Sequence, residues 1–264
     1  MSSPLLGSAL VLLLFSLAAA PQQTTTSAAS TQDPQAVAIL QEAIAAMGGA
    51  PSDSTLAGTV TATVGSQSQT GTIQVFTLGT NQSQEVIALP DLSQTTTFSA
   101  WLASQANGMA TTEVSSELAA TSQTALFPSP LLTAALNGPD YNLQFVGTDT
   151  VNGAAANHVR IANTFATSLT YLQPISTFTT RDVWFDQASG LPLKIIFTQQ
   201  VTFGTSYKTV VELDLSNYQQ SGGFTYPSVI QKSVNGTPWL AISIRSAAFN
   251  TGLSTSQFQV SCSN

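Results

Sequence analysis

Apolar residues near the start of this chain recur with the period of a helix. They occupy every third or fourth position between residues 34 and 47, which predicts one amphipathic helix. These positions are Val37, Leu40, Ile44 and Met47. Asp33 can accept hydrogen bonds from the free N–H groups at the start of the helix, Pro34 suits its first position, and Gly48-Gly49 ends it. One face of this helix must be covered by other parts of the chain.

From residue 56 onward apolar and polar positions alternate, as in strands with one buried face. The predicted strands are 56–64, 70–78, 82–89, 95–103, 142–150, 154–162, 181–186, 192–201, 207–220, 225–234 and 239–249. Short turns such as Asn152-Gly153 and Asn235-Gly236 join neighbouring strands, which favours antiparallel pairing. The predicted fold class is mainly β (α+β), with a single curled antiparallel sheet of about eleven strands.

Two stretches interrupt the strand pattern. Residues 112–137 predict one or two short helices, the second of which begins near Pro128 and Pro130. Residues 163–180 fit either a loop or a short helix that lies over the sheet. The sheet must bury one face, so we expect the helices at 34–47 and 112–137 to cover it. Alanine-rich helices fill little volume, and we therefore expect a cavity beneath them.

The register of one hairpin can be predicted from the sequence. Residues 192–201 and 207–215 alternate in apolarity on either side of Gly204. Residues that lie opposite each other in a hairpin share a face of the sheet. A three-residue turn centred on Gly204 meets this condition and therefore fixes which residues pair. The predicted pairs are Leu193 with Leu215, Ile195 with Leu213, Phe197 with Val211, and Lys194 with Asp214. The last pair is expected to be a surface ion pair worth at most about 1 kcal/mol.

The chain begins with an apolar run from Leu5 to Leu17, followed by Ala18-Ala19-Ala20. This pattern predicts a secretory signal peptide over residues 1–20, with cleavage between positions 19 and 29. A membrane anchor is the alternative interpretation, although the run is shorter than the roughly 20 residues that span a bilayer. We therefore expect a periplasmic or otherwise exported protein with no transmembrane span in its mature chain.

The remaining sequence predicts a short leader and one domain. Residues 21–32 are uncharged, low in complexity and without an apolar pattern, which is typical of a flexible segment. Residues 33–264 are expected to form a single domain, because all-β folds of roughly 200–250 residues are common.

Charged residues are scarce, and this excludes one class of partner. They make up 7% of the chain, against about 25% in ordinary soluble proteins. The six basic residues all lie at or after Arg160, and the formal net charge is −7. Such a chain cannot neutralise many phosphates, so we expect no nucleic-acid binding. Cys262 is the only cysteine, which excludes an internal disulfide and leaves no cysteine after the apolar run for lipid attachment.

The residues that could support catalysis are few and poorly spaced for it. His158 is the only histidine, whereas a metal site needs several ligands. Asp182 and Asp186 share a strand face about 13 Å apart, beyond the roughly 5–9.5 Å of glycosidase pairs. Glu212 and Asp214 alternate with apolar residues and fit a solvated row. We therefore expect no enzyme, no catalytic residue, no metal and no cofactor.

Five segments, in order, resemble the LolA/LolB-like family of envelope lipoprotein-carrier and lipid-binding domains. They are Ala45-Ala46-Met47-Gly48-Gly49; Asn142-Leu143-Gln144-Phe145-Val146-Gly147 with Val151-Asn152-Gly153; Val183-Trp184-Phe185-Asp186 with Ser189-Gly190-Leu191-Pro192; Tyr218 with Gly222-Gly223-Phe224-Thr225-Tyr226-Pro227; and Phe249-Asn250 with Phe258. The resemblance implies an unclosed half-barrel that is covered by short helices. Its concave, apolar side would hold acyl chains.

This resemblance suggests a ligand class and a set of residues that line the cavity. The expected lining residues are Phe76, Phe98, Trp101, Phe145, Trp184 and Phe197, with ordinary core packing as the alternative for each. The leading hypothesis is an exported, non-enzymatic protein that binds a lipid, an acyl chain or a lipoprotein, in a role like that of a lipoprotein carrier. Binding would depend on chain length more than on headgroup charge. The alternative is an interaction or sensing module with an envelope protein as partner, and a hydrolase ranks third.

Overall fold

The computed structural model describes residues 31–108, 110–115, 119, 126–165, 179–200 and 208–260. The expected signal peptide lies outside these ranges, as does most of the expected leader. The helices are α1 (Pro34–Ala46), α3 (Ser129–Asn137) and the 3-10 helix η2 (Thr255–Phe258). The strands are β1 (Asp53–Val64), β2 (Gln67–Leu78), β3 (Gln82–Leu89), β4 (Leu92–Ser99), β5 (Leu102–Ala106), β6 (Thr111–Val114), β7 (Tyr141–Val151), β8 (Ala154–Asn163), β9 (Arg181–Asp186), β10 (Pro192–Gln200), β11 (Lys208–Ser221), β12 (Phe224–Val234) and β13 (Thr237–Phe249).

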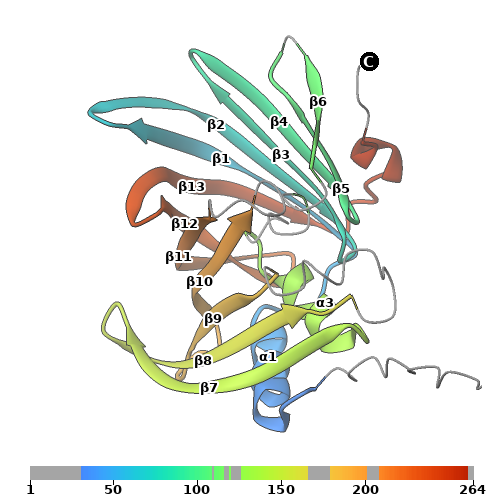
Figure 1. Ribbon diagram of the computed structural model, residues 1–264, viewed down its shortest axis with the longest axis vertical. Coiled ribbons are helices and arrows are strands. Elements are labelled where there is room, and N and C mark those ends of the chain that lie inside the picture. Colours follow the sequence, from blue (N-terminus) through green and yellow to red (C-terminus); the bar gives the residue numbers. More distant parts are fainter. Residues whose placement is uncertain are drawn as a thin grey trace, which may run out of the picture.

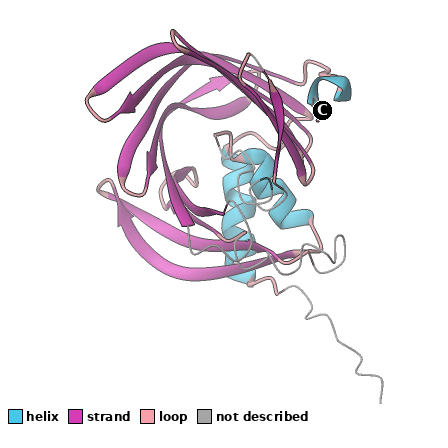
Figure 2. Cartoon of the chain, turned by 45° about the horizontal axis from the view of Figure 1, so that its top comes forward, coloured by secondary structure: helices cyan, strands magenta, loops and turns pink. Residues whose placement is uncertain are grey.

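The thirteen strands form one antiparallel sheet that curls without closing (Figure 1). Its order is β6-β5-β4-β3-β2-β1-β13-β12-β11-β10-β9-β8-β7, so β6 and β7 are its two edges. Helices α1 and α3 lie within the curve (Figure 2). We call the face toward these helices the inner face and the opposite one the outer face. The predicted mainly-β half-barrel is therefore confirmed.

The two additional strands have local causes. The segment predicted as one strand over 95–103 is a hairpin of β4 and β5, because Ala100 adopts a positive φ of 53° and turns the chain. Thr111–Val114, placed at the start of the helical stretch 112–137, pairs instead with β5 as β6. Helix α3 follows Pro128, as expected.

The hairpin register predicted from parity is confirmed. Lys194 pairs with Asp214, Ile195 with Leu213 and Phe197 with Val211. The Lys194 Nζ lies 3.5 Å from Asp214 Oδ1, and Glu212 is its closer partner. Residues 201–207, with the expected turn at Gly204, lie outside the described residues.

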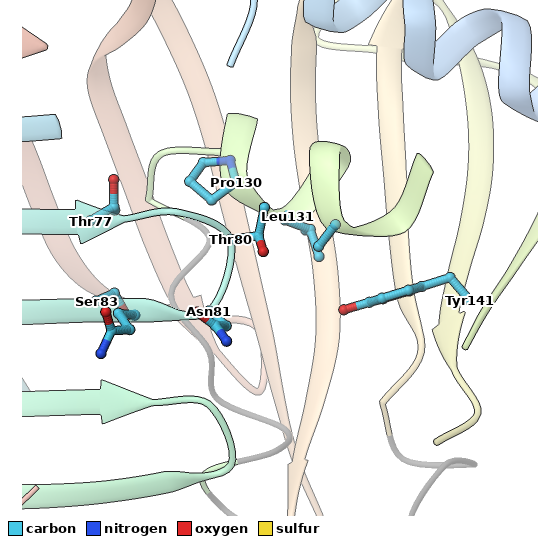
Figure 3. Close-up of a pocket in the computed structure, with 9 residues that line it drawn as sticks. Thr77, Thr80, Asn81, Ser83, Pro130, Leu131 and Tyr141 are labelled. Carbon is cyan, nitrogen blue, oxygen red and sulfur yellow. The ribbon is translucent and has the colours of Figure 1, made fainter. Parts of the chain in front are cut away.

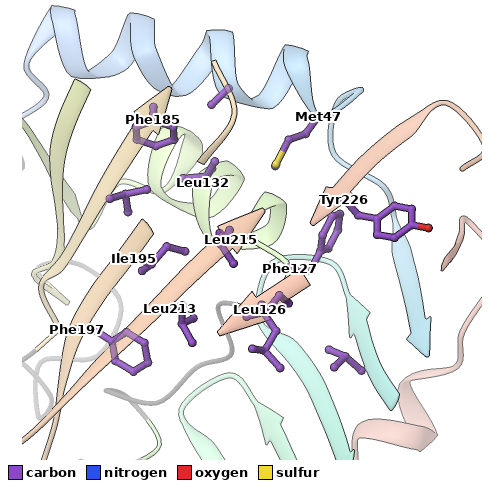
Figure 4. Packing of buried hydrophobic residues seen from close by; sticks show 14 of the residues in the cluster. Met47, Leu126, Phe127, Leu132, Phe185, Ile195, Phe197, Leu213, Leu215 and Tyr226 are labelled. Atoms are coloured by element: carbon purple, nitrogen blue, oxygen red, sulfur yellow. The ribbon is translucent and has the colours of Figure 1, made fainter. Parts of the chain in front are cut away.

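The space between α1 and the sheet is filled by a hydrophobic core (Figure 4). Ala36, Leu40 and Ala43 of α1 are fully buried, as are Phe127 and Leu132. Small alanines let the helix approach the strands closely, and large side chains from the sheet fill the space that remains. The inner-face side chains of this core include Leu56, Val75, Val159, Val183, Phe185, Ile195, Leu213, Ile230 and Ile242.

Three of the segments that carry the resemblance meet around α1. A Cβ added to Gly48, whose φ is +85°, would lie 2.1 Å from the carbonyl oxygen of Gly223. The Thr225 N–H donates to the Met47 carbonyl oxygen at 2.9 Å. A Cβ added to Gly190 would lie 3.1 Å from Glu42 Cγ. These segments therefore hold the helix on the sheet.

Asp53 fastens the segment that follows β13. Its carboxylate, 2% exposed, accepts hydrogen bonds from the Thr251 N–H and hydroxyl, both at 2.7 Å, and from the Gly252 N–H at 2.9 Å. Beyond this clamp, η2 packs on the outer face of β3 and β4 with Phe258 fully buried. Burial raises the pKa of the Asp53 carboxyl, but these hydrogen bonds outweigh it and leave the pKa below its ordinary value.

The first residues that the structure describes pair with the edge strand β7. Gln32 forms a parallel bridge with Leu143, whose N–H donates to the Thr31 carbonyl oxygen at 2.9 Å. The Asp33 side chain caps α1 by accepting from the Gln35 N–H at 2.8 Å, as expected. The last residues of the expected leader therefore belong to the sheet.

Substitution Gly48→Ala is expected to destabilise the protein by at least about 2 kcal/mol more than Gly49→Ala. Both glycines have positive φ, but a Cβ at Gly49 meets nothing within 4 Å, so the control carries only the backbone cost. Urea denaturation of both variants measures the difference. Equal losses of stability would contradict a close contact between Gly48 and Gly223.

Substitution Asp53→Asn is expected to cost about 1–3 kcal/mol at pH 7, because a buried hydrogen-bonded carboxylate is replaced. The pKa of Asp53 in the native state lies below its value of about 3.9 in the unfolded chain. Its contribution is therefore complete above about pH 5, falls as the unfolded chain takes up the proton, and is lost once the pH has fallen through the native pKa. Urea denaturation at pH 7 and pH 3 tests this, and a stability difference that stays the same at both would be the contrary result.

Candidate functional site

Two cavities lie at opposite ends of strands β1 to β4. The first, the distal cavity, has a volume of about 230 Å³ and lies where hairpins β1–β2 and β3–β4 end. It is lined by Ala62, Val64, Gln67, Gln69, Ile87, Leu89, Asp91, Leu92, Gln94, Trp239 and Leu240. In-register pairs such as Ala62 with Leu240 place most of these side chains on the inner face. The cavity therefore continues the apolar inner surface beyond the packed core.

The rim of the distal cavity exposes large apolar side chains. Val64 is 72% exposed, Leu92 42% and Trp239 37%. Lys232 Nζ lies 4.7 Å from the centroid of the Trp239 ring, which places one cation beside the rim. Asp91 also lines the cavity and accepts a hydrogen bond from the Gln69 side-chain amide at 2.5 Å. Solvent-exposed apolar groups around an apolar hollow are typical of a ligand entrance.

The second cavity, the seam cavity, lies where the turns β2–β3 and β4–β5 approach α3 and the start of β7. Its volume is about 310 Å³. It is lined by Thr80, Asn81, Trp101, Thr133, Ala134, Asn137, Gly138, Pro139, Asp140, Tyr141 and Asn163. A smaller hollow of about 30 Å³ adjoins it (Figure 3), where the Tyr141 ring projects toward the β2–β3 turn and Leu131.

A second, water-sized hollow of about 10 Å³ brings Arg181 to the same place. Trp101, Tyr141 and Asn163 line both this hollow and the seam cavity. The Arg181 side chain is 5% exposed, donates to the Thr179 carbonyl oxygen at 2.7 Å and lies 5.4 Å from the Phe197 ring centroid. Its register partners are Ile161 and Phe197, so β9 places a guanidinium on the apolar inner face.

Tyr141 and Arg181 influence each other electrostatically. Burial raises the pKa of the Tyr141 phenol, and the positive charge of Arg181 only partly offsets this. Burial lowers the pKa of the Arg181 guanidinium, which nevertheless keeps its charge because arginine is the strongest base among the side chains. A neutral hydroxyl and a buried cation therefore line the small hollow that adjoins the seam cavity.

The six aromatic residues expected to line one cavity do not share one place. Phe98 and Phe197 lie on the inner face and are buried, and Phe145 packs against the core from β7. Trp101 lines the seam cavity and makes an edge-to-face contact with Phe165 at 4.7 Å. Contact of these four residues with a ligand stays a prediction.

Phe76 and Trp184 lie on the outer face. Phe76 pairs with Gln84, which hydrogen-bonds to the segment that carries η2, while its neighbours Val75 and Thr77 are buried on the inner face. Trp184 alternates with the buried Val183 and Phe185. Strand alternation is the physical reason, because adjacent side chains point to opposite faces.

On the outer face, Trp184 belongs to a network of paired polar groups. Its ring stacks on His158 with centroids 4.2 Å apart, and its indole N–H donates to Asp149 at 3.2 Å. His158 Nε2 lies 2.8 Å from Asp182 Oδ1, which also accepts from Arg160 Nε at 2.9 Å. These groups satisfy one another as neighbours across strands β8 and β9, so His158 has a structural role in the sheet.

Within the part of the chain that the structure describes, no three His, Cys, Asp or Glu side chains gather as a metal site requires. None of the described helices has the length and hydropathy needed to cross a bilayer.

Sequence reasoning missed Arg181, Tyr141 and Trp239 as cavity residues. For Arg181 a signal existed, because it shares parity with Val183 and Phe185.

Comparison with known proteins identifies the fold. No protein-family model matches the chain, and neither does any curated protein sequence. An outer membrane lipoprotein-sorting protein domain from Vibrio parahaemolyticus is similar in structure, with a TM-score of 0.57, 15% identity, and coverage of 84% of this chain and 95% of that one.

Two further solved structures agree with this result. A LolA superfamily protein from Nitrosomonas europaea has a TM-score of 0.56 at 15% identity, with coverage of 85% of this chain and 97% of that one. A DUF1329 family protein from Desulfovibrio piger has a TM-score of 0.54 at 12% identity, with coverage of 84% and 96%. The half-barrel described above therefore shares its fold with these solved structures, one of them a LolA superfamily protein, as the sequence resemblance predicted.

Proposed function

We propose that this chain is an exported, non-enzymatic envelope protein that binds the apolar chain of a lipid or acylated ligand in the distal cavity. The observation that carries the proposal is a hollow of about 230 Å³ on the inner face, lined mostly by apolar side chains and open at a rim of exposed apolar groups. A cavity with aliphatic walls favours apolar guests, because each methylene moved from water into it contributes about 0.8 kcal/mol.

The fold supports this proposal by analogy. The similar structures include a domain described as lipoprotein-sorting. The family resemblance in the sequence implies a concave, apolar side that would hold acyl chains. A role as carrier would require the ligand to enter and leave, which suits the open rim better than a sealed core. The alternative, an interaction module, would use the same exposed rim to contact another envelope protein.

Export predicts a shortened chain. We expect the mature protein to begin between residues 20 and 30, because the apolar run suits the signal machinery. N-terminal sequencing of protein recovered from the envelope measures this. An intact Met1 would refute processing and favour the membrane anchor.

Binding of neutral 1-alkanols from octanol to dodecanol is expected to strengthen about tenfold or more for every two methylenes, until the cavity is filled. The three tryptophans report on separate places: Trp239 on the distal cavity, Trp101 on the seam cavity and Trp184 on the outer face. In 5-fluorotryptophan-labelled protein, alkanols should shift the ¹⁹F resonance of Trp239 and leave that of Trp184 unchanged. Single Trp→Phe variants assign the resonances.

A matched pair of variants locates this binding. Ala62→Phe places a ring in the distal cavity and should weaken dodecanol binding at least tenfold. Thr63→Phe is the control, because Thr63 follows on the same strand with the opposite orientation and bonds Ser68 on the outer side. Affinity that ignores chain length, or no shift at Trp239, would contradict the lipid-binding function and favour the interaction module.

A further inference from the structure

Arg181 holds its charge in an unusual place for this protein. Of the six basic residues, the other five have exposed or half-buried side chains, whereas Arg181 is buried on the inner face. Alternation along β9 places it in line with Val183 and Phe185, where an aliphatic side chain would cost nothing to bury. Removing a guanidinium from water is costly, and an anion that approaches it recovers part of that cost.

We propose that the seam cavity is a second binding site, beyond the proposed function of the distal cavity, and that it takes an anionic carboxylate or phosphate group at Arg181. The hollow at Arg181, of about 10 Å³, matches one oxygen-sized group and no more. The adjoining cavity of about 310 Å³ accommodates the rest of the molecule. The ligand therefore enters with its charged end first.

The charges and donors around the site favour this orientation. The hollow is lined by Trp101, Leu131, Tyr141, Ile161, Asn163, Thr179 and Arg181, a set without an acid. Asp140, which is buried, lines the larger cavity and not the hollow, so it disfavours an anion anywhere but at the Arg181 end. Tyr141 keeps its proton at neutral pH, since burial raises its pKa, and its hydroxyl can donate beside the guanidinium.

The shared chemistry has two sources, an amphiphile and a small free acid. The aliphatic and aromatic atoms of Trp101, Ala134 and Pro139 in the larger cavity would contact the chain of an amphiphile. A small free anion would place one oxygen in the hollow and would contact little of the larger cavity. Octanoate and acetate separate the two sources, because they carry the same carboxylate and differ in the chain.

The test titrates 5-fluorotryptophan-labelled protein with octanoate, acetate and 1-octanol below micelle-forming concentrations. Octanoate should shift the ¹⁹F resonance of Trp101, with an affinity at least tenfold above that of octanol at the same resonance. Stronger binding of octanoate than of acetate identifies an amphiphile, and equal binding identifies a small free anion. Octanol that shifts Trp101 as strongly as octanoate, or octanoate that leaves Trp101 unmoved, would overturn the proposal.

Variants separate binding from the structural role of Arg181. Arg181→Met removes the charge and should abolish the preference for octanoate over octanol, while Arg181→Lys should keep part of it. Tyr141→Phe keeps the ring and should weaken octanoate binding several-fold without affecting the alkanol shifts at Trp239.

A preference for octanoate over octanol that survives Arg181→Met would contradict an anion site at Arg181. If that variant does not fold, the comparison of octanoate with octanol in the unsubstituted protein still decides. Failure of the distal-cavity proposal appears separately, at Trp239.

Discussion

The contact of Gly48 with the carbonyl of Gly223 determines where α1 sits, and the rest of the half-barrel depends on that placement. An unclosed sheet of thirteen strands cannot bury its inner face on itself, so a helix must occupy the curve. The contact brings the end of α1 against the β11–β12 turn, and the hydrogen bond from Thr225 to Met47 holds it there. Any side chain at Gly48 would lift the helix and open the core beneath it.

Helix α1 fills the middle of the curve. The cavities described above consequently lie toward the ends of the strands. The core under α1 combines small helical residues such as Ala36 and Ala43 with large strand residues such as Phe185. The distal cavity begins where the core ends, near Leu240, and the seam cavity begins where α3 meets Tyr141. The two cavities consequently differ in character, because aliphatic side chains are the largest group in the lining of the distal cavity, whereas polar side chains are the largest group in that of the seam cavity.

Much of this architecture could be predicted from the sequence, since alternation and turn residues encode strands and registers locally. The pairing of Lys194 with Asp214 followed from parity alone. The hairpin at Ala100 could not be foreseen, because a positive φ in alanine depends on tertiary context. Parity also bears on Trp184 and Arg181. The aromatic character of Trp184 suggested the cavity, but alternation around Val183 places Trp184 on the outer face and Arg181 on the inner face. The seam cavity joins segments far apart in sequence, which no local pattern reveals.

The pairing of Gln32 with Leu143 sets a limit on how the chain can be trimmed. A protease that cuts before Thr31 leaves the bridge to β7 and the cap at Asp33 in place. A cut after Gln32 would remove the partner of an edge strand and the residues that guide the chain into α1. The leader can thus be removed only up to Thr31, where the backbone first joins the sheet. This limit follows from the fold and does not depend on which protease cuts the chain.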